Sequence, residues 1–272
     1  MQEWDLTPEE ITKIVRGWTW SFSRVNAFSQ CLYAAYLKYV LGHEGLPNAW
    51  AQFGTACHET YEKYLKQEIS MFEAADYYRE AFSKYVTCDF PKNKYVDLGQ
   101  KAFEQGEEYF NNINFDFDRY EVLGVEEELQ FNIGDYKFHG FADAIYRDKE
   151  TGEIILDDHK TSSFSYLKSG EVAKKDKEHF LSFKRQLYLY SIPLIEKYGR
   201  VDKLMWDMIR DNKQIIIPWQ KEEFDEARLW ALQNIVNLEN ETLWLPDNSS
   251  SFFCSCICDQ RAECPYRPVG NG

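Results

Sequence analysis

Residues 154–161 read Ile-Ile-Leu-Asp-Asp-His-Lys-Thr, an apolar run that ends in two acids, a histidine and a lysine. A short apolar run of this kind is typical of a strand buried in the middle of a sheet. Side chains two residues apart on a strand share a face, so Asp158 and Lys160 project together. Asp157 and His159 then point to the opposite face. Because a buried charged pair is costly unless a metal ion or a substrate compensates, the segment predicts a functional site.

A further acid lies one hairpin upstream, in the segment 140–143, Gly-Phe-Ala-Asp. Residues 148–153, Asp-Lys-Glu-Thr-Gly-Glu, have turn chemistry, and pairing about this turn places Asp143 roughly opposite Asp158. Two facing carboxylates repel each other. A shared proton would relieve the repulsion, as would a hard divalent cation such as Mg²⁺. Lys160 favours the cation, because a lysine beside a metal site can orient a water that attacks phosphorus.

The segments around this hairpin predict an α/β fold. Alternating apolar and polar residues over 120–161 indicate three strands in a meander, and two more strands are expected at 204–210 and 214–219. Capping residues and helical spacing predict helices over 7–12, 21–41, 50–68, 72–86, 96–110, 179–197 and 222–240. Residues 1–272 are therefore expected to form one domain, with a helical part (1–110), a sheet and helix core (120–220) and a C-terminal part (221–272).

Composition indicates a globular chain. Its 272 residues are 44% hydrophobic and 28% charged, which allows a sizeable core. The formal net charge of −14 argues against attraction of nucleic acid to the whole surface, so such binding would need a local basic channel. The N-terminal sequence lacks a signal-peptide pattern, and no apolar run approaches the roughly 18 residues of a membrane-spanning helix. We therefore expect a cytoplasmic protein with no membrane partner.

The cysteines are clustered rather than spread evenly. Of seven in the chain, four fall in residues 254–264, which read Cys-Ser-Cys-Ile-Cys-Asp-Gln-Arg-Ala-Glu-Cys. In a reducing compartment, such thiols are more often metal ligands or spare core residues than disulfides. A set of four thiolates suits either a [4Fe-4S] cluster or a structural zinc ion.

The acids and the lysine together resemble the motifs of the PD-(D/E)XK nuclease superfamily, in the form shared by RecB-type nuclease domains and CRISPR-associated nucleases with an iron-sulfur cluster. Residues 53–59, Phe-Gly-Thr-Ala-Cys-His-Glu, look like the Gly-Thr-x-x-His segment of that family. Gln186 and Tyr190 look like its Gln-x-x-x-Tyr motif. The resemblance implies a restriction-endonuclease-like core, in which helices flank a central mixed β-sheet, with a helical N-terminal region and a Cys-rich C-terminal tail.

The resemblance also implies roles for these residues. One or two Mg²⁺ or Mn²⁺ ions would be held by His58, Asp143, Asp158 and the backbone carbonyl of His159. Lys160 would position the attacking water, and Gln186 and Tyr190 would complete the catalytic set. Glu128, on the preceding strand, is either a further ligand or a solvated strand-edge residue. Without the resemblance, a lone histidine such as His58 would be interpreted as a surface or core residue, and Tyr190 as ordinary packing.

The cysteines extend the resemblance. Residues 21–28, followed by Cys31 in the predicted helix 21–41, are similar to the opening helix of the family, in which one cysteine joins three near the C-terminus. The implied cofactor is a [4Fe-4S] cluster, with zinc as the alternative.

The tail departs from the family spacing at one position. Cys258 and Cys264 keep the last spacing, but Ser255 occupies the position expected for a third cysteine. Either Cys254 or Cys256 must then supply the remaining thiolate. We expect Cys254, because its wider spacing leaves the chain room to wrap around a cluster.

The resemblance implies a metal-dependent DNA nuclease. We expect it to be an exonuclease that acts in replication, recombination or repair, either of a cell or of a phage. DNA that is single-stranded or has single-stranded ends is the expected partner, alongside a helicase, a recombination protein or further copies of the chain. Residues 158–185 carry seven lysines and arginines against four acids, so this segment would contact the phosphate backbone or form a solvated loop.

Two other functions are alternatives to the nuclease. A non-catalytic DNA-binding or assembly subunit would keep the fold and the cluster. However, Asp143, Asp158 and Lys160 are all present, which disfavours a site that has lost its catalytic activity. A glycosidase would use Asp143 and Asp158 as its acid pair. That hypothesis has only the aromatic content in its favour and leaves Lys160 and the cysteines unexplained.

Overall fold

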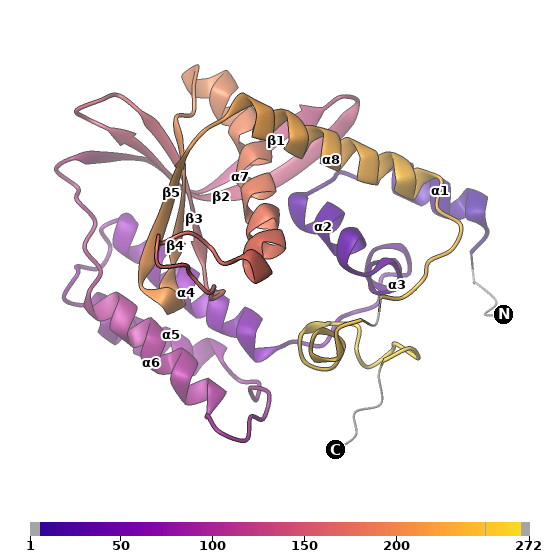
Figure 1. Cartoon of the computed structure of the whole chain (residues 1–272), viewed down its shortest axis with the longest axis horizontal. Coiled ribbons are helices and arrows are strands. Elements are labelled where there is room, and N and C mark those ends of the chain that lie inside the picture. The colour runs from indigo at the N-terminus through magenta and orange to yellow at the C-terminus, as the bar shows by residue number, and fades with distance from the viewer. Residues whose placement is uncertain (1–5, 248, 268–272) are drawn as a thin grey trace. The chain divides into compact units, whose positions relative to one another are not determined.

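The computed structural model describes residues 6–247 and 249–267, and its elements are labelled in Figure 1. The chain divides into two compact units. Unit 1 is assembled from Met1–Pro47, Gln130–Gly140 and Asp225–Gly272. Unit 2 is assembled from Asn48–Leu129 and Phe141–Phe224. Among the described residues, no helix combines the length and the apolar content needed to cross a membrane.

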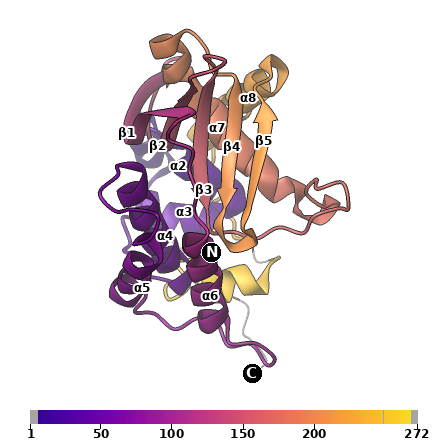
Figure 2. The same ribbon diagram turned by 90° about the vertical axis from the view of Figure 1, so that its left-hand side faces the viewer.

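A mixed β-sheet is the central element. Its strands are hydrogen-bonded in the order of the chain (Figure 2), namely β1 (Tyr120–Ile133), β2 (Tyr136–Asp148), β3 (Ile154–Lys160), β4 (Lys203–Met208) and β5 (Lys213–Pro218). β2 and β3 are antiparallel, β3 and β4 are parallel, and β4 and β5 are antiparallel. This architecture confirms the predicted α/β fold with a central mixed sheet flanked by helices.

The register of β2 and β3 follows from the turn between them. Asp148 accepts backbone hydrogen bonds from Glu150 and Thr151, and Gly152 takes the positive φ of 73° that a tight turn requires. The pairs run from Arg147–Ile154 to Ala144–Asp157. Continuing this register by one residue places Asp143 opposite Asp158, as the sequence predicts.

Four helices belong to unit 2, namely α4 (Ala49–Leu65), α5 (Ala74–Tyr85), α6 (Leu98–Asn111) and α7 (Lys177–Tyr198), with short 3₁₀ turns at Lys174–Asp176 and Ile209–Asp211. Helices α4, α5 and α6 share one buried core with the face of the sheet that carries Tyr146, Ile155 and Met205. Helix α7 packs on the other face, where Phe180 contacts Trp206. The sheet is therefore covered on both faces, which explains why β3 is buried along almost its whole length.

Unit 1 holds α1 (Pro8–Arg16), α2 (Phe22–Gln30), α3 (Leu32–Ala35) and most of α8 (Lys221–Glu239), with π-helical turns at Tyr36–Val40 and Phe253–Ile257. Thr7 and Glu10 form the predicted capping box of α1. The prediction of one helix over 21–41 with Cys31 inside it is wrong. Cys31 has an extended backbone (φ −160°, ψ 107°) and ends α2 where α3 begins. Because the helix is interrupted there, the Cys31 side chain does not follow the helical spacing. The Cys31 sulfur accepts a hydrogen bond from the backbone N–H of Asp247.

The packing of α5 against α6 depends on a glycine. A Cβ atom added to Gly106 would overlap the hydroxyl group and the ring of Tyr78, which is fully buried. We expect Gly106→Ala to lower the free energy of unfolding by about 1–3 kcal/mol through overpacking. Lys101→Ala, on the exposed side of the same helix, is the control and should change it by less than about 0.5 kcal/mol. Urea denaturation of both variants measures the difference, and equal stabilities would contradict the packing argument.

Candidate active site

Three elements of unit 2 bring a histidine, an acid and a second histidine together. His58 comes from α4, Asp143 from β2 and His159 from β3, and one potential ligand atom of each lies within 4.8 Å of the other two. His58 Nδ1 is 3.5 Å from Asp143 Oδ2. The same Oδ2 atom accepts a 2.7 Å hydrogen bond from the backbone N–H of His159. Nitrogen and carboxylate donors at this spacing can hold a divalent cation.

Asp158 and Lys160 point to the other face of β3, as the alternation of a strand requires. Lys160 Nζ lies 2.9 Å from Asp158 Oδ1 and 2.7 Å from Oδ2. Gln186, on α7, accepts a 3.0 Å hydrogen bond from Lys160 and donates a 3.1 Å bond to Asp158. The Phe183 ring lies beneath the ammonium group at 4.9 Å. Lys160 is therefore held in a fixed position by an acid, an amide and an aromatic face.

Tyr190, on the same helix as Gln186, interacts electrostatically with both Asp143 and Asp158. Burial raises the pKa of its hydroxyl group, and the negative charges of Asp158 and Asp143 raise it further. The hydroxyl group therefore stays protonated at neutral pH and can act as a hydrogen-bond donor. The structure thus gathers all the residues for which the sequence predicted a catalytic role in unit 2.

The two facing acids have different environments. Burial alone would raise the pKa of Asp143, but the charges of His58 and Lys160 and the hydrogen bond from the backbone N–H of His159 outweigh it and lower the pKa. Burial raises the pKa of Asp158 to about 6, although Lys160 opposes the shift. Burial also lowers the pKa of His159, which keeps its imidazole neutral and able to bind a metal. At neutral pH the pair therefore presents negative charge to a cation.

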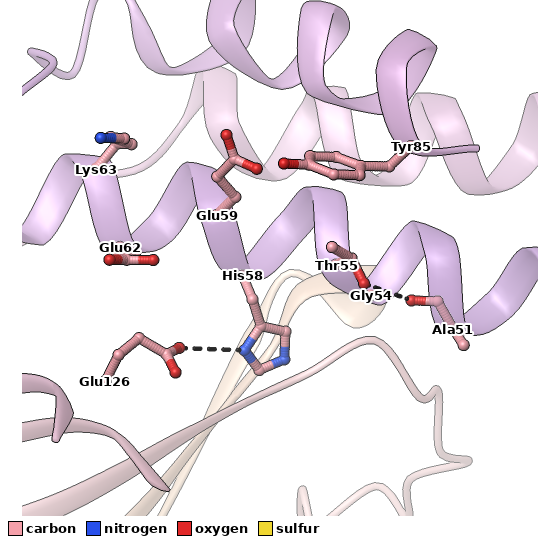
Figure 3. A pocket seen from close by; sticks show the side chains of 9 residues that line it. All are labelled: Ala51, Gly54, Thr55, His58, Glu59, Glu62, Lys63, Tyr85 and Glu126. Atoms are coloured by element: carbon pink, nitrogen blue, oxygen red, sulfur yellow. Dashed lines mark hydrogen bonds and ion pairs between the residues drawn. The ribbon is translucent and has the colours of Figure 1, made fainter. Parts of the chain in front are cut away.

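A glutamate that the sequence did not single out lies beside His58. Glu126 Oε1 is 3.9 Å from His58 Nδ1, and Figure 3 shows the two side chains pointing toward each other. Glu126 adopts a φ of 51° inside β1, a conformation that is uncommon for any residue but glycine. The predicted candidate, Glu128, is exposed two residues further on. Residues 126–128 are all glutamate, so the alternation of side chains along a strand cannot tell which of them faces the site. Only the irregular backbone identifies Glu126.

The site opens into a pocket of about 710 Å³ that is shown in Figure 3. Its lining combines one face of α4 with one residue of α5 and one of β1, namely Ala51, Gly54, Thr55, His58, Glu59, Glu62, Lys63, Tyr85 and Glu126. Gly54, from the predicted Gly-Thr-x-x-His segment, lies one turn before His58 on α4. Because it has no side chain, the helix presents its backbone to the pocket there.

A buried polar network lies on the face of the sheet toward α4. His159 Nε2 is 3.2 Å from Asp157 Oδ2, which also accepts a 3.0 Å hydrogen bond from the Tyr146 hydroxyl group. Asp207 enters from β4, opposite His159 in the parallel register, and accepts a 3.0 Å bond from Tyr61. Sequence reasoning missed Asp207, because a parallel pairing across a helical crossover leaves no local signal.

Four cysteines of unit 1 line one small cavity, namely Cys31, Cys254, Cys258 and Cys264. Cys256 is not among the lining residues of this cavity. Burial raises the pKa of Cys254, and the nearby thiols of Cys31 and Cys264 raise it further. Asp247 joins two members of the set, because its N–H donates to Cys31 Sγ at 3.4 Å and its carbonyl accepts from Cys254 Sγ at 3.7 Å.

The basic segment predicted over 158–185 is only partly available to a ligand. Lys184 forms an ion pair with Glu223, whereas Lys168, Lys174 and Lys175 are exposed. Lys177 and Lys184 also line a second pocket, of about 690 Å³, between α7 and β5.

The buried acids make stability depend on pH. Burial raises the pKa values of Asp157 and Asp207 to about 7, from an ordinary value of 3.8. Between these values the folded protein binds more protons than the unfolded chain, so stability is full at low pH and falls as the pH rises toward 7. We expect Asp207→Asn to make this decline shallower by up to about 1.4 kcal/mol per pH unit.

Urea denaturation at a series of pH values between about 5 and about 7 measures this slope. The asparagine oxygen can still accept the hydrogen bond from Tyr61, so the fold should persist. Asp89→Asn, on the exposed surface of the same unit, is the matched control. A slope that is the same in the Asp207 and Asp89 variants would contradict the assignment.

Comparison with known proteins identifies the family. The sequence matches the PD-(D/E)XK nuclease superfamily over residues 19–269. A solved structure from Eubacterium rectale, described as a "Putative exonuclease", aligns with a TM-score of 0.53 and 14% identity over 96% of this chain and 94% of that chain. The structure of SSO0001 aligns with a TM-score of 0.32 and 19% identity over 87% of this chain and 95% of that chain. No curated protein matches the sequence. Because the family match extends over nearly the whole chain, the protein belongs to the PD-(D/E)XK nuclease superfamily.

Proposed function

We propose that the protein is a metal-dependent deoxyribonuclease, and specifically an exonuclease that acts in DNA replication, recombination or repair. The observation that carries this proposal is the convergence of His58, Asp143 and His159 beside the bound pair Asp158–Lys160. A site for a cation and a fixed ammonium group are the two parts that hydrolysis of a phosphodiester requires. Family membership supports the same reaction.

The residues fit a divalent cation. Asp143 is ionised, His58 and His159 offer nitrogen donors, and Asp158 lies in register with Asp143 on the neighbouring strand. We propose that His58, Asp143, Asp158 and the backbone carbonyl of His159 hold Mg²⁺ or Mn²⁺. Such an ion supplies a Lewis acid for the scissile phosphate and lowers the pKa of a water.

Side chains of β3 and α7 hold the groups that would position the reacting atoms. Asp158 and Gln186 hold the Lys160 ammonium group from two sides, so its remaining N–H can donate to an attacking water or to a phosphate oxygen. Gln186 also donates a hydrogen bond to Asp158, which links this acid of β3 to helix α7. Tyr190 completes the set as a protonated hydroxyl donor. We infer that these residues orient the reacting groups and lose little entropy when substrate binds.

DNA with single-stranded ends is the substrate that we propose. With a net charge of −14 the surface as a whole repels a phosphate backbone, so binding must be local. The exposed lysines over 168–177 lead into helix α7, which carries Gln186. A helicase, a recombination protein or further copies of the chain would then deliver suitable ends.

Lys160→Ala should lower the rate of cleavage by at least about 100-fold, because it removes the positioned ammonium group. Lys101→Ala, on the exposed side of α6 and outside the segment 158–185, is the matched control and should retain most of the activity. The substrates are end-labelled single-stranded DNA, end-labelled double-stranded DNA and a closed circle, each with Mg²⁺, with Mn²⁺ or with a chelator. Cutting that needs the metal and spares the circle would support an exonuclease.

The opposite result would change the proposed function. If the folded, metal-loaded wild type leaves all three substrates intact, the hydrolase proposal fails. Retained binding of the labelled DNA in that case would favour a non-catalytic DNA-binding or assembly subunit.

We further propose that the four cysteines lining the unit 1 cavity hold one metal centre, a [4Fe-4S] cluster, with structural zinc as the alternative. Four sulfur donors from two distant parts of the chain suit either centre. Metal binding would offset the raised pKa values of Cys254 and Cys258, because a coordinated thiol is deprotonated. The Asp247 N–H, which already donates to Cys31 Sγ, would then stabilise the thiolate.

The cavity distinguishes two neighbouring cysteines. We expect Cys254→Ser to lose the bound metal and Cys256→Ser to retain it, because Cys254 lines the cavity. The measurement is the content of iron, acid-labile sulfide and zinc in anaerobically purified protein, together with visible absorbance. Iron with sulfide would identify the cluster, and zinc without sulfide would identify the alternative. Equal metal content in the two variants would contradict the assignment of Cys254.

A further inference from the structure

We propose that the imidazole of His159, and not only its backbone, is a direct ligand of the divalent ion at the active site, and that Asp157 orients it. The inference rests on the proposed function, because it concerns the same metal site. It adds a ligand at the middle position of the Asp-x-Lys motif, and it predicts which metal the site prefers.

The position of the ring supports this role. The His58 and His159 rings are 6.0 Å apart between centroids, and both reach the same carboxylate. A ring nitrogen of His159 lies within 4.8 Å of both the His58 donor and the Asp143 oxygen. Donors on opposite sides of an ion are separated by about twice the metal–ligand distance, or roughly 4.2 Å. Separations of no more than 4.8 Å therefore bring the three donors near the spacing that one ion requires.

The surroundings of the ring support the same role. Its Nε2 atom lies 3.2 Å from Asp157 Oδ2, which leaves Nδ1 as the nitrogen for a cation. A histidine ligand usually donates its second ring N–H to a carboxylate, which fixes the tautomer and raises the basicity of the nitrogen that binds the metal. Asp157 lies in that position and is itself held by the Tyr146 hydroxyl group.

A second contact fixes the plane of the ring. Tyr61 stacks on the His159 imidazole with 3.7 Å between centroids and 28° between planes, and its hydroxyl group is tied to Asp207. His159, Asp157 and Asp207 are each no more than 2% exposed. The imidazole is thus held rigidly before any metal binds, and its orientation costs little on binding.

Two imidazoles in one site alter its selectivity. Mg²⁺ prefers oxygen donors in a near-ideal octahedron, whereas nitrogen donors favour later divalent metals over Mg²⁺. With nitrogens from His58 and His159 beside the oxygens of Asp143, the site is expected to bind Mn²⁺ more tightly than Mg²⁺. Removal of one imidazole should weaken Mn²⁺ binding more than Mg²⁺ binding.

The test counts the coordinated nitrogens. Full-length protein with ¹⁵N-labelled histidine is loaded with Mn²⁺ alone and studied by pulsed electron paramagnetic resonance, which detects nitrogen bound to the ion. The variants are His58→Gln and His159→Gln, and the matched control is His139→Gln, an exposed histidine in unit 1. A glutamine amide can occupy the Nε2 position and keep the contact with Asp157, but it offers no group at Nδ1.

We expect two nitrogens in the wild type and in the His139 variant, and one in each of the other two. The Mn²⁺ dissociation constant should rise at least about 10-fold in His159→Gln, and about 10- to 100-fold in Asp157→Asn, in which a neutral amide replaces the carboxylate that raises the basicity of the ring. A single nitrogen in the wild type, removed by His58→Gln, would overturn the inference, and so would a failure to bind Mn²⁺. The count in the wild type decides even if a variant does not fold.

The nuclease proposal is judged separately, by cleavage of DNA. One bound nitrogen together with metal-dependent cleavage would refute the role of the His159 ring and leave the nuclease intact. Two bound nitrogens without cleavage would support the role of the His159 ring and refute the nuclease.

Discussion

The antiparallel pairing of β2 with β3 is the interaction on which the rest of the site depends. Because only five residues join the two strands, their register is set locally, and it brings Asp143 opposite Asp158. A slip of one residue would turn every side chain of β3 to the other face and separate the two acids. The hydrogen bond from the His159 N–H to Asp143 holds β2 and β3 together where their ladder ends.

Strand alternation then divides the chemistry between two faces of β3. The even positions, Asp158 and Lys160, meet Gln186 of α7, whereas the odd positions, Asp157 and His159, meet the buried tyrosines on the side of α4. The face toward α7 carries the acid and the lysine, and on the face toward α4 Asp157 and His159 are each no more than 2% exposed. A rigid, fully hydrogen-bonded layer behind a reactive one is a physical means of keeping donor positions fixed without help from the substrate.

Local signals predicted much of this arrangement, and long-range geometry supplied the rest. The hairpin, the facing acids and the position of Lys160 follow from turn chemistry and period-two spacing, both of which are readable in residues 140–161. Glu126 could not be selected among three consecutive glutamates, because a φ of 51° inside a strand has no sequence signature outside glycine. Asp207 and the break at Cys31 depend on partners about 50 and more than 200 residues away, respectively.

The interleaving of the two units has a consequence for biosynthesis. The chain passes between the units after Pro47, Leu129, Gly140 and Phe224, so unit 2 is complete once Phe224 has been made, while unit 1 still awaits Asp225–Gly272. Domains made on the ribosome fold in the order in which their segments emerge. The N-terminal helices of unit 1 must therefore wait, with their apolar sides uncovered, until Asp225–Gly272 has been made. Apolar surface exposed during this stage of synthesis makes the nascent chain prone to aggregation.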